Sequence, residues 1–152
     1  MSFTPSPVVR EIGGACLAVR ARMLARAVSS AYDNALADLG VTISQVNIMV
    51  AVGHFESCTP SRIGRLLAME RSTVSRNLRA MLERGWLAPE SGQGGRLRSI
   101  SLTNRGVRKL EALLPAWHRA QQQAASLVGD AGVSSLRQIG ERLWARNSAS
   151  DN

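Results

Sequence analysis

Apolar residues recur every three to four positions from about Val8 to Leu39, and this spacing predicts a long helix. The stretch is rich in alanine, which favours helix. Gly13 and Gly14 are expected to fray or kink the helix, and Gly40 is expected to end it. A helix this long and this apolar is expected to pack against more than its own domain.

Shorter helices are predicted to follow. The first spans about 44–53, with Thr42 or Ser44 as its N-cap, and its apolar residues lie on most sides, which predicts burial. The next helix opens at Thr59–Pro60, because threonine is a good N-cap and proline suits the first turn. A turn is expected around 68–70.

The helix after this turn runs to about Arg84 and has two different faces. At about 100° per residue, one face carries the apolar residues Val74, Leu78, Met81 and Leu82. The small hydroxyl and basic residues on the rest of the helix are Ser72, Thr73, Ser75, Arg76 and Arg79. Its first turn also offers unpaired N–H groups and the positive end of the helix dipole to an anion.

A hairpin is predicted next. Residues 86–91 and 96–102 are typical of two short strands, and the glycine-rich segment 92–95 is typical of the turn between them. Arg96 and Arg98 lie beside its tip. A solvated hairpin tip is one interpretation, and a probe for DNA phosphates or the minor groove is the one that two arginines favour.

The chain is expected to end in helices over about 104–128, with a kink at Pro115, and over about 133–145, after a break at 129–132. These elements predict a mainly α (α+β) protein with a winged helix-turn-helix fold. Residues 41–103 would form the winged helix-turn-helix DNA-binding domain. Residues 1–40 and 104–152 would form a discontinuous helical dimerisation domain, since their apolar faces exceed what the winged domain can cover.

Charge supports a polyanionic partner. The chain carries a net charge of +8, and between residues 59 and 109 eleven basic residues face three acidic ones, a difference that equals the charge of the whole chain. Lys109 is the single lysine; a GC-rich coding sequence also favours arginine over lysine. The clustering itself predicts binding to double-stranded DNA.

Catalytic and metal chemistry are not expected. Neither His54 nor His118 has an acid and a nucleophile near it in the sequence, and Cys16 and Cys58 do not have the spacing of metal ligands. We therefore expect that the protein is not an enzyme and binds no metal and no cofactor. The absence of a signal peptide and of an 18-residue apolar run predicts no membrane partner and a cytoplasmic protein.

Three segments resemble MarR-type (multiple-antibiotic-resistance regulator) transcription factors: VTISQVNIMVAV at 41–52, TPSRIGRLLAMERSTVSRNLRAMLERGWL at 59–87 and RLRSISLTNRG at 96–106. The order of helices is also similar, so the resemblance covers nearly the whole chain. It implies a homodimer that binds a palindromic operator, usually as a repressor, and that is released by a small phenolic or other aromatic effector, or by oxidation.

The resemblance also implies site residues. Ser72, Thr73, Ser75 and Arg76 match the DNA-contacting helix, and Arg96 matches the wing arginine. The family often has an aspartate two residues before that arginine, where this chain has Gly94, so Arg98 is expected to share the role of Arg96.

Regulation leaves alternatives open. Candidate linings of an effector pocket between the long helices and the winged domain are Arg20, Met23, Met49, His54 and Trp117. One alternative is a thiol-based oxidant sensor acting through Cys16, although the sensing position of that family branch falls on Ala18 here. Another is a winged-helix protein-interaction module that never binds DNA; the outward arginines argue against it.

Overall fold

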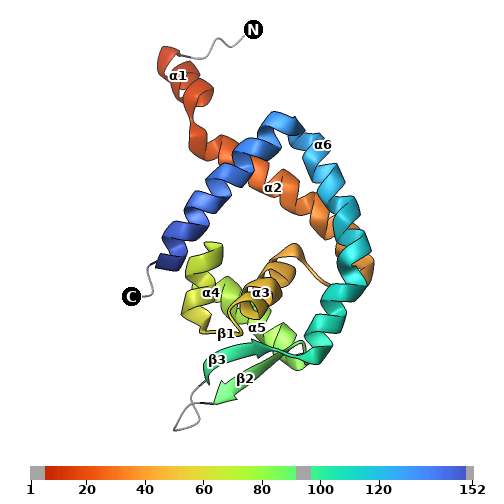
Figure 1. Cartoon of the computed structure of the whole chain (residues 1–152). Helices are drawn as coiled ribbons and strands as arrows, with labels where there is room; N and C mark the ends of the chain where they lie inside the picture. Colours follow the sequence, from red (N-terminus) through yellow and green to blue (C-terminus); the bar gives the residue numbers. More distant parts are fainter. Residues whose placement is uncertain (1–5, 92–96, 150–152) are drawn as a thin grey trace.

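The computed structural model describes residues 6–91 and 97–149 (Figure 1). The predicted N-terminal helix is present in two pieces, α1 (Pro7–Ala15) and α2 (Leu17–Leu36), followed by a 3-10 turn, η1 (Ala37–Leu39). The break lies at Cys16, where ψ is 110°, so the helix does not break at Gly13 and Gly14, which stay in α1. Gly40 ends η1 in the left-handed conformation that glycine adopts easily.

Three helices form the centre of the chain: α3 (Ile43–His54), α4 (Pro60–Leu67) and α5 (Arg71–Glu83). Thr42 caps α3 through a capping box, in which its hydroxyl accepts from the N–H of Gln45 and the Gln45 side chain accepts from the N–H of Thr42. As its composition predicts, α3 is buried. Its residues Ile48, Met49 and Val52 are fully covered and form the middle of the core.

A small antiparallel sheet completes the winged helix. Its strands are β1 (Ser57–Cys58), β2 (Leu87–Ser91) and β3 (Leu97–Leu102), in the order β1-β3-β2. We call the β2–β3 hairpin the wing; Leu87 pairs with Leu102, Pro89 pairs with Ile100, and the register shifts after Glu90. The sequence did not predict β1, because two residues are too few to show alternation.

The C-terminal region is one helix, α6 (Asn104–Ala149), interrupted at Gly129, where φ is 70° and ψ is 169°. The helix therefore breaks where the sequence predicts, but only Gly129 leaves helical geometry, rather than all four residues of 129–132. Pro115 lies inside the helix, and the backbone leaves helical geometry at Gly129 rather than there. Beyond Gly129 the helix crosses α2 and returns towards α4 (Figure 1).

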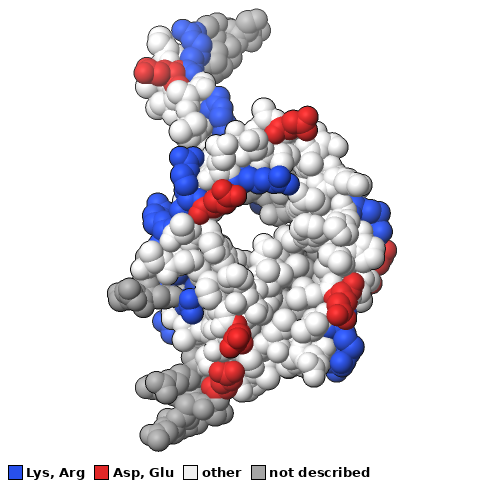
Figure 2. Space-filling view, viewed as in Figure 1, with Lys and Arg blue, Asp and Glu red and all other residues white. Residues whose placement is uncertain are grey.

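Two regions of different burial result. The winged helix has a closed core, whereas the terminal helices keep large apolar residues exposed, among them Ile12 at 63% and Leu17 at 80%. The terminal helices and the winged helix enclose an opening in the middle of the molecule (Figure 2). The mainly helical winged fold expected from the sequence is confirmed.

An aromatic cluster joins the last part of α6 to the winged helix. The ring of Trp144, near the end of α6, stacks on Phe55 at 6.1 Å between centroids and 17° between planes. Phe55 also carries the guanidinium of Arg62 at 4.1 Å and the edge-on ring of His54 at 4.7 Å. The last helix is thereby attached to the ends of α3 and α4.

Candidate DNA-binding surface

The helix-turn-helix consists of α4, a tight turn and α5. The hydroxyl of Thr59 accepts from the N–H of Arg62 at 3.1 Å and so caps α4. The helix ends at Ala68, which takes the left-handed conformation with φ of 50°. The turn passes close over α4 at Gly64, where an added Cβ would lie 3.2 Å from the carbonyl oxygen of Met69.

The two faces of α5 are those expected from the sequence. Val74, Leu78 and Met81 are buried in the winged-helix core. Ser72, Ser75, Arg76 and Arg79 are exposed and Thr73 is half-buried. The core side therefore holds the helix in place and leaves its small hydroxyls and two arginines at the surface.

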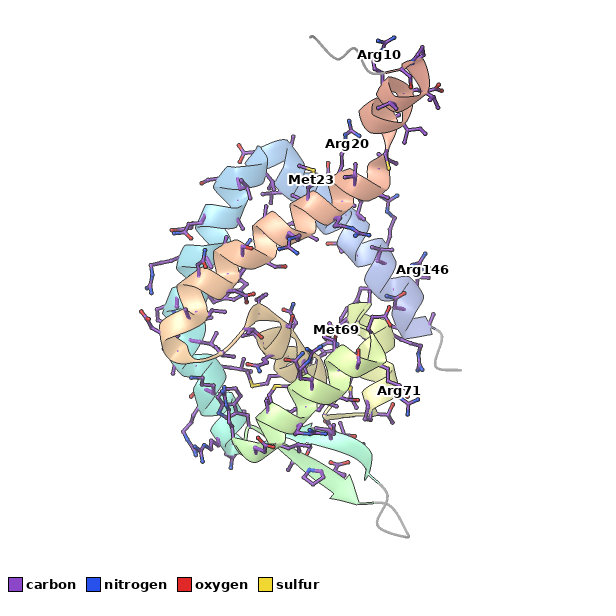
Figure 3. The ribbon with its side chains drawn as sticks, turned by 180° about the vertical axis from the view of Figure 1, so that it is seen from behind. Arg10, Arg20, Met23, Met69, Arg71 and Arg146 are labelled. Carbon is purple, nitrogen blue, oxygen red and sulfur yellow. The ribbon has the colours of Figure 1, made fainter. Side chains whose placement is uncertain are left out.

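The start of α5 suits an anion. Glu70 holds the N-cap position, but its side chain forms no hydrogen bond to the described part of this helix. The N–H groups of the first turn can therefore face a phosphate. Met69 and Arg71, which flank Glu70 in the sequence, are labelled in Figure 3.

The wing lies next to α5. Within it, the hydroxyl of Ser99 donates to a carboxylate oxygen of Glu90 at 2.6 Å, which joins β3 to β2 across the hairpin. Arg96 and Gly94 lie outside the described residues. For Arg98 the structure describes the backbone position in β3 and not the side chain.

Positive charge surrounds these elements. Arg65, Arg71, Arg105 and Arg108 are exposed on α4, α5 and the first turns of α6. Figure 2 shows that basic and acidic groups share the face it presents. The described residues contain no group of three or more His, Cys, Asp or Glu placed to hold a metal ion.

The structure does not gather the five candidate effector residues into one pocket. Met49 is in the core at 0% exposure, whereas Met23 is exposed on the first half of α2 beside Arg20 (Figure 3). The Arg20 guanidinium donates to the carbonyl oxygens of Gly14 and Cys16, across the α1–α2 break.

The other two candidates pack against different aromatic partners. His54 belongs to the aromatic cluster with Trp144. Trp117 packs against Tyr32 at 6.3 Å, where α6 lies on α2. The sequence could not show that His54 and Trp117 lie apart, because their separation depends on how the helices pack.

A pocket of about 130 Å³ lies elsewhere, between α2 and both sides of the α6 break. Its lining is mostly apolar and includes Val28, Val128 and Leu136. Its polar groups come from Tyr32, Gln121 and Arg137, and the Tyr32 hydroxyl donates to the side-chain oxygen of Gln121. Burial raises the pKa of the Tyr32 phenol, so it stays neutral at physiological pH. The sequence did not reveal this pocket, because its two sides come from residues 89 or more positions apart.

Cys16 and Cys58 are not joined in a disulfide. Cys16 is half-buried at the N-cap position of α2. Cys58 is buried in β1, and its thiol donates to the carbonyl oxygen of Ala51 at 3.9 Å.

A helix-turn-helix with an exposed basic second helix and a wing beside it is the winged helix-turn-helix arrangement, in which the second helix can enter the major groove of DNA. Residues 39–97, which are this part of the chain, match the model of the MarR family. No curated protein matches the sequence.

Several solved structures are similar in fold to most of this chain. A transcriptional regulator from M. tuberculosis, MOSR, in complex with DNA, is 27% identical with a TM-score of 0.69, over 89% of this chain and 98% of that one. A probable transcriptional regulator from Pseudomonas aeruginosa is 24% identical with a TM-score of 0.70, over 86% and 98%. A mutant of MarR from E. coli, complexed with operator DNA, is 17% identical with a TM-score of 0.73, over 91% and 99%.

The chain has the winged helix-turn-helix fold of these transcriptional regulators, and its residues 39–97 are the part that matches the MarR family. Within the described residues no single helix is long and apolar enough to cross a membrane. The bent pair Leu17–Leu39 and Ile43–His54 is long and apolar enough only when the two segments are taken together, by length and composition alone.

Proposed function

We propose that the protein is a homodimeric repressor that reads a palindromic operator with its two α5 helices. The observation that carries the proposal is the exposed face of α5. Small hydroxyls at Ser72 and Ser75 let the backbone approach DNA closely, and Arg76 and Arg79 can reach base edges or phosphates. Arg96 and Arg98 of the wing would contact the adjacent backbone or minor groove.

The dimer would be formed by the terminal regions, 1–40 and 104–152, with 41–103 as the DNA-binding domain. Apolar side chains on these helices remain exposed in one copy, including Val8, Ile12, Leu17, Ile139 and Leu143. Exposed patches of this kind are typical of protein interfaces. A symmetric pair places two reading helices about one DNA turn, ~34 Å, apart.

The first test is selection of bound sequences from random duplex DNA, followed by affinity measurements on the selected site. Arg76→Ala should weaken binding roughly tenfold to a hundredfold, because one base contact contributes about 1–3 kcal/mol. Arg119→Ala removes an exposed arginine from the middle of α6 and serves as the control. Equal affinity of Arg76→Ala and wild type would exclude α5 as the reading helix.

The wing is tested by its salt dependence. Arg96→Ala combined with Arg98→Ala should lower the slope of log K against log salt by ~0.9 for each phosphate that the wing no longer neutralises. An unchanged slope would contradict a phosphate contact by the wing.

The dimer is tested by sedimentation. Ile139→Asp places a charge on the exposed apolar side of α6 and should yield monomers with little operator affinity. Val50→Asp, at an exposed valine of α3, is the control and should remain dimeric. A dimeric Ile139→Asp protein would contradict this interface.

We also propose that a small aromatic effector binds in the pocket between α2 and α6. The apolar lining would hold a ring, and Arg137 and Gln121 would bind a polar substituent. Aromatic acids that raise the melting temperature of wild type should fail to do so with Ala125→Leu, which fills the pocket. An equal shift in both proteins would place the effector elsewhere.

A further inference from the structure

Two cations join the end of the N-terminal helices to the winged helix. Arg84 is the C-cap residue of α5, and its Nη1 donates to the carbonyl oxygen of Gly40 at 2.5 Å. Lys109, in the second turn of α6, donates from Nζ to the carbonyl oxygen of Leu39, also at 2.5 Å. Both carbonyls lie where η1 ends, at the negative end of the α2–η1 segment, which favours positive charge.

One indole lies between these cations. Trp86 is 7% exposed, and its ring centroid is 4.9 Å from the Arg84 guanidinium carbon and 5.2 Å from the Lys109 ammonium. Each cation therefore has two partners, an aromatic ring and a carbonyl oxygen, and both interactions stabilise the same side-chain position. A solvated surface arginine or lysine would have no such reason to hold one conformation.

The start of α6 is attached to the same tryptophan. The backbone N–H and the hydroxyl of Thr103 both donate to the carbonyl oxygen of Trp86, at 3.1 Å each. We call Arg84, Trp86 and Lys109, with the carbonyls of Leu39 and Gly40, the Trp86 junction. It connects α5, which we propose reads DNA, with α2 and α6, which we expect to form the dimer.

We propose that Arg84 and Lys109 are positioning residues that set the orientation of α5 relative to the terminal helices. In a dimer this orientation fixes the distance between the two α5 helices, and so the spacing of half-sites that the protein accepts. The inference rests on the proposed homodimer, because one copy alone has no such distance. Lys109 acts through the carbonyl of Leu39 and not through a contact with DNA.

The test uses Lys109→Met, which keeps an unbranched side chain, shorter by one atom, and removes its charge. Affinities are measured for the selected operator and for duplexes with one or two base pairs inserted or deleted between half-sites. Wild type should discriminate strongly against altered spacing, since half-sites are read about 10–10.5 base pairs apart. In Lys109→Met this discrimination should fall by roughly tenfold, the effect of losing one charged hydrogen bond.

Three controls separate positioning from other roles. Lys109→Arg keeps a cation within reach and should retain the spacing preference. Arg108→Met removes the same charge one residue earlier, from an exposed side chain, and should also retain it. The salt slope of Lys109→Met should equal that of wild type. If Lys109→Met does not fold, Arg84→Gln tests the second cation and should show the same loss.

Two outcomes would overturn the proposal. In one, Lys109→Met keeps the wild-type spacing preference. In the other, its salt slope falls by ~0.9 while the preference stays, which would make Lys109 a phosphate contact. A wild-type protein that binds DNA with no spacing preference would instead refute the palindrome-binding dimer, and the positioning role with it.

Discussion

Replacing Gly106 with alanine should strongly destabilise the protein. Gly106 lies in the first turn of α6, and an added Cβ would be 2.3 Å from the carbonyl oxygen of Trp86 and 2.6 Å from Cδ1 of Leu102. A real Cβ essentially never comes closer than 3.0 Å to another atom. The carbonyl belongs to the backbone and cannot rotate away, so α6 has to move away from the start of β2.

The magnitude follows from what this movement disturbs. Overpacking typically costs about 1–3 kcal/mol. The shift also weakens the bonds from Thr103 to the carbonyls of Trp86 and Gly85, each worth about 0.5–1.5 kcal/mol. The preference of alanine for helix offsets about 1 kcal/mol. We therefore expect a loss of about 2–5 kcal/mol out of a total stability of about 5–15 kcal/mol.

Urea denaturation followed by far-UV circular dichroism measures this loss, at one protein concentration for all variants because dimerisation also affects the midpoint. Gly140→Ala is the matched control: it lies in the same helix, and apart from its chain neighbours and the adjacent backbone of its own helix no described atom is within 4 Å of the added Cβ. It should leave stability unchanged or raise it by up to about 1 kcal/mol. The reasoning is refuted if Gly106→Ala unfolds at the same urea concentration as wild type.

Three further predictions concern single residues. Thr42→Ala removes the capping box of α3 and should lower stability by about 1 kcal/mol in the same denaturation assay; no change would show that the cap is dispensable. Met81→Ala leaves a cavity beneath α5 and should lower stability by about 2–5 kcal/mol, whereas a loss below about 1 kcal/mol would mean that the site collapses fully. The phenol of Tyr32, the single tyrosine, should titrate above its ordinary pKa of about 10 because it is buried, so stability should be unaffected by this group below pH 10 and should fall above it. Absorbance of tyrosinate in the folded protein reports the titration directly, and an ordinary value would contradict the burial.

Local patterns were sufficient for most of the fold. Thr42 and Thr59 each directly precede a helix, and both act as N-caps. The period of Val74, Leu78 and Met81 identified the buried side of α5, and the remaining positions are exposed or half-buried, as expected. These features depend on residues within one or two turns of each other, which is what periodicity detects.

Features that depend on distant residues could not be predicted in this way. The α2–α6 pocket and the Trp86 junction combine residues from separate helices, and β1 exists because Ser57 and Cys58 meet Ser101 and Ile100 of β3. Met49 was a reasonable pocket candidate by residue type, but α3 is covered on most sides. The DNA-contacting and effector residues remain predictions, since each depends on a partner molecule.

The aromatic cluster around Trp144 has a consequence for folding order. Phe55 and Trp144 are about ninety positions apart, so their contact cannot form until the end of the chain is available. The core that the winged helix shares with α2 and α6 extends along α6 to Ala124 and does not include Trp144. During synthesis, the DNA-binding fold should therefore form first, and the last helix should dock onto Phe55 only when the chain is released.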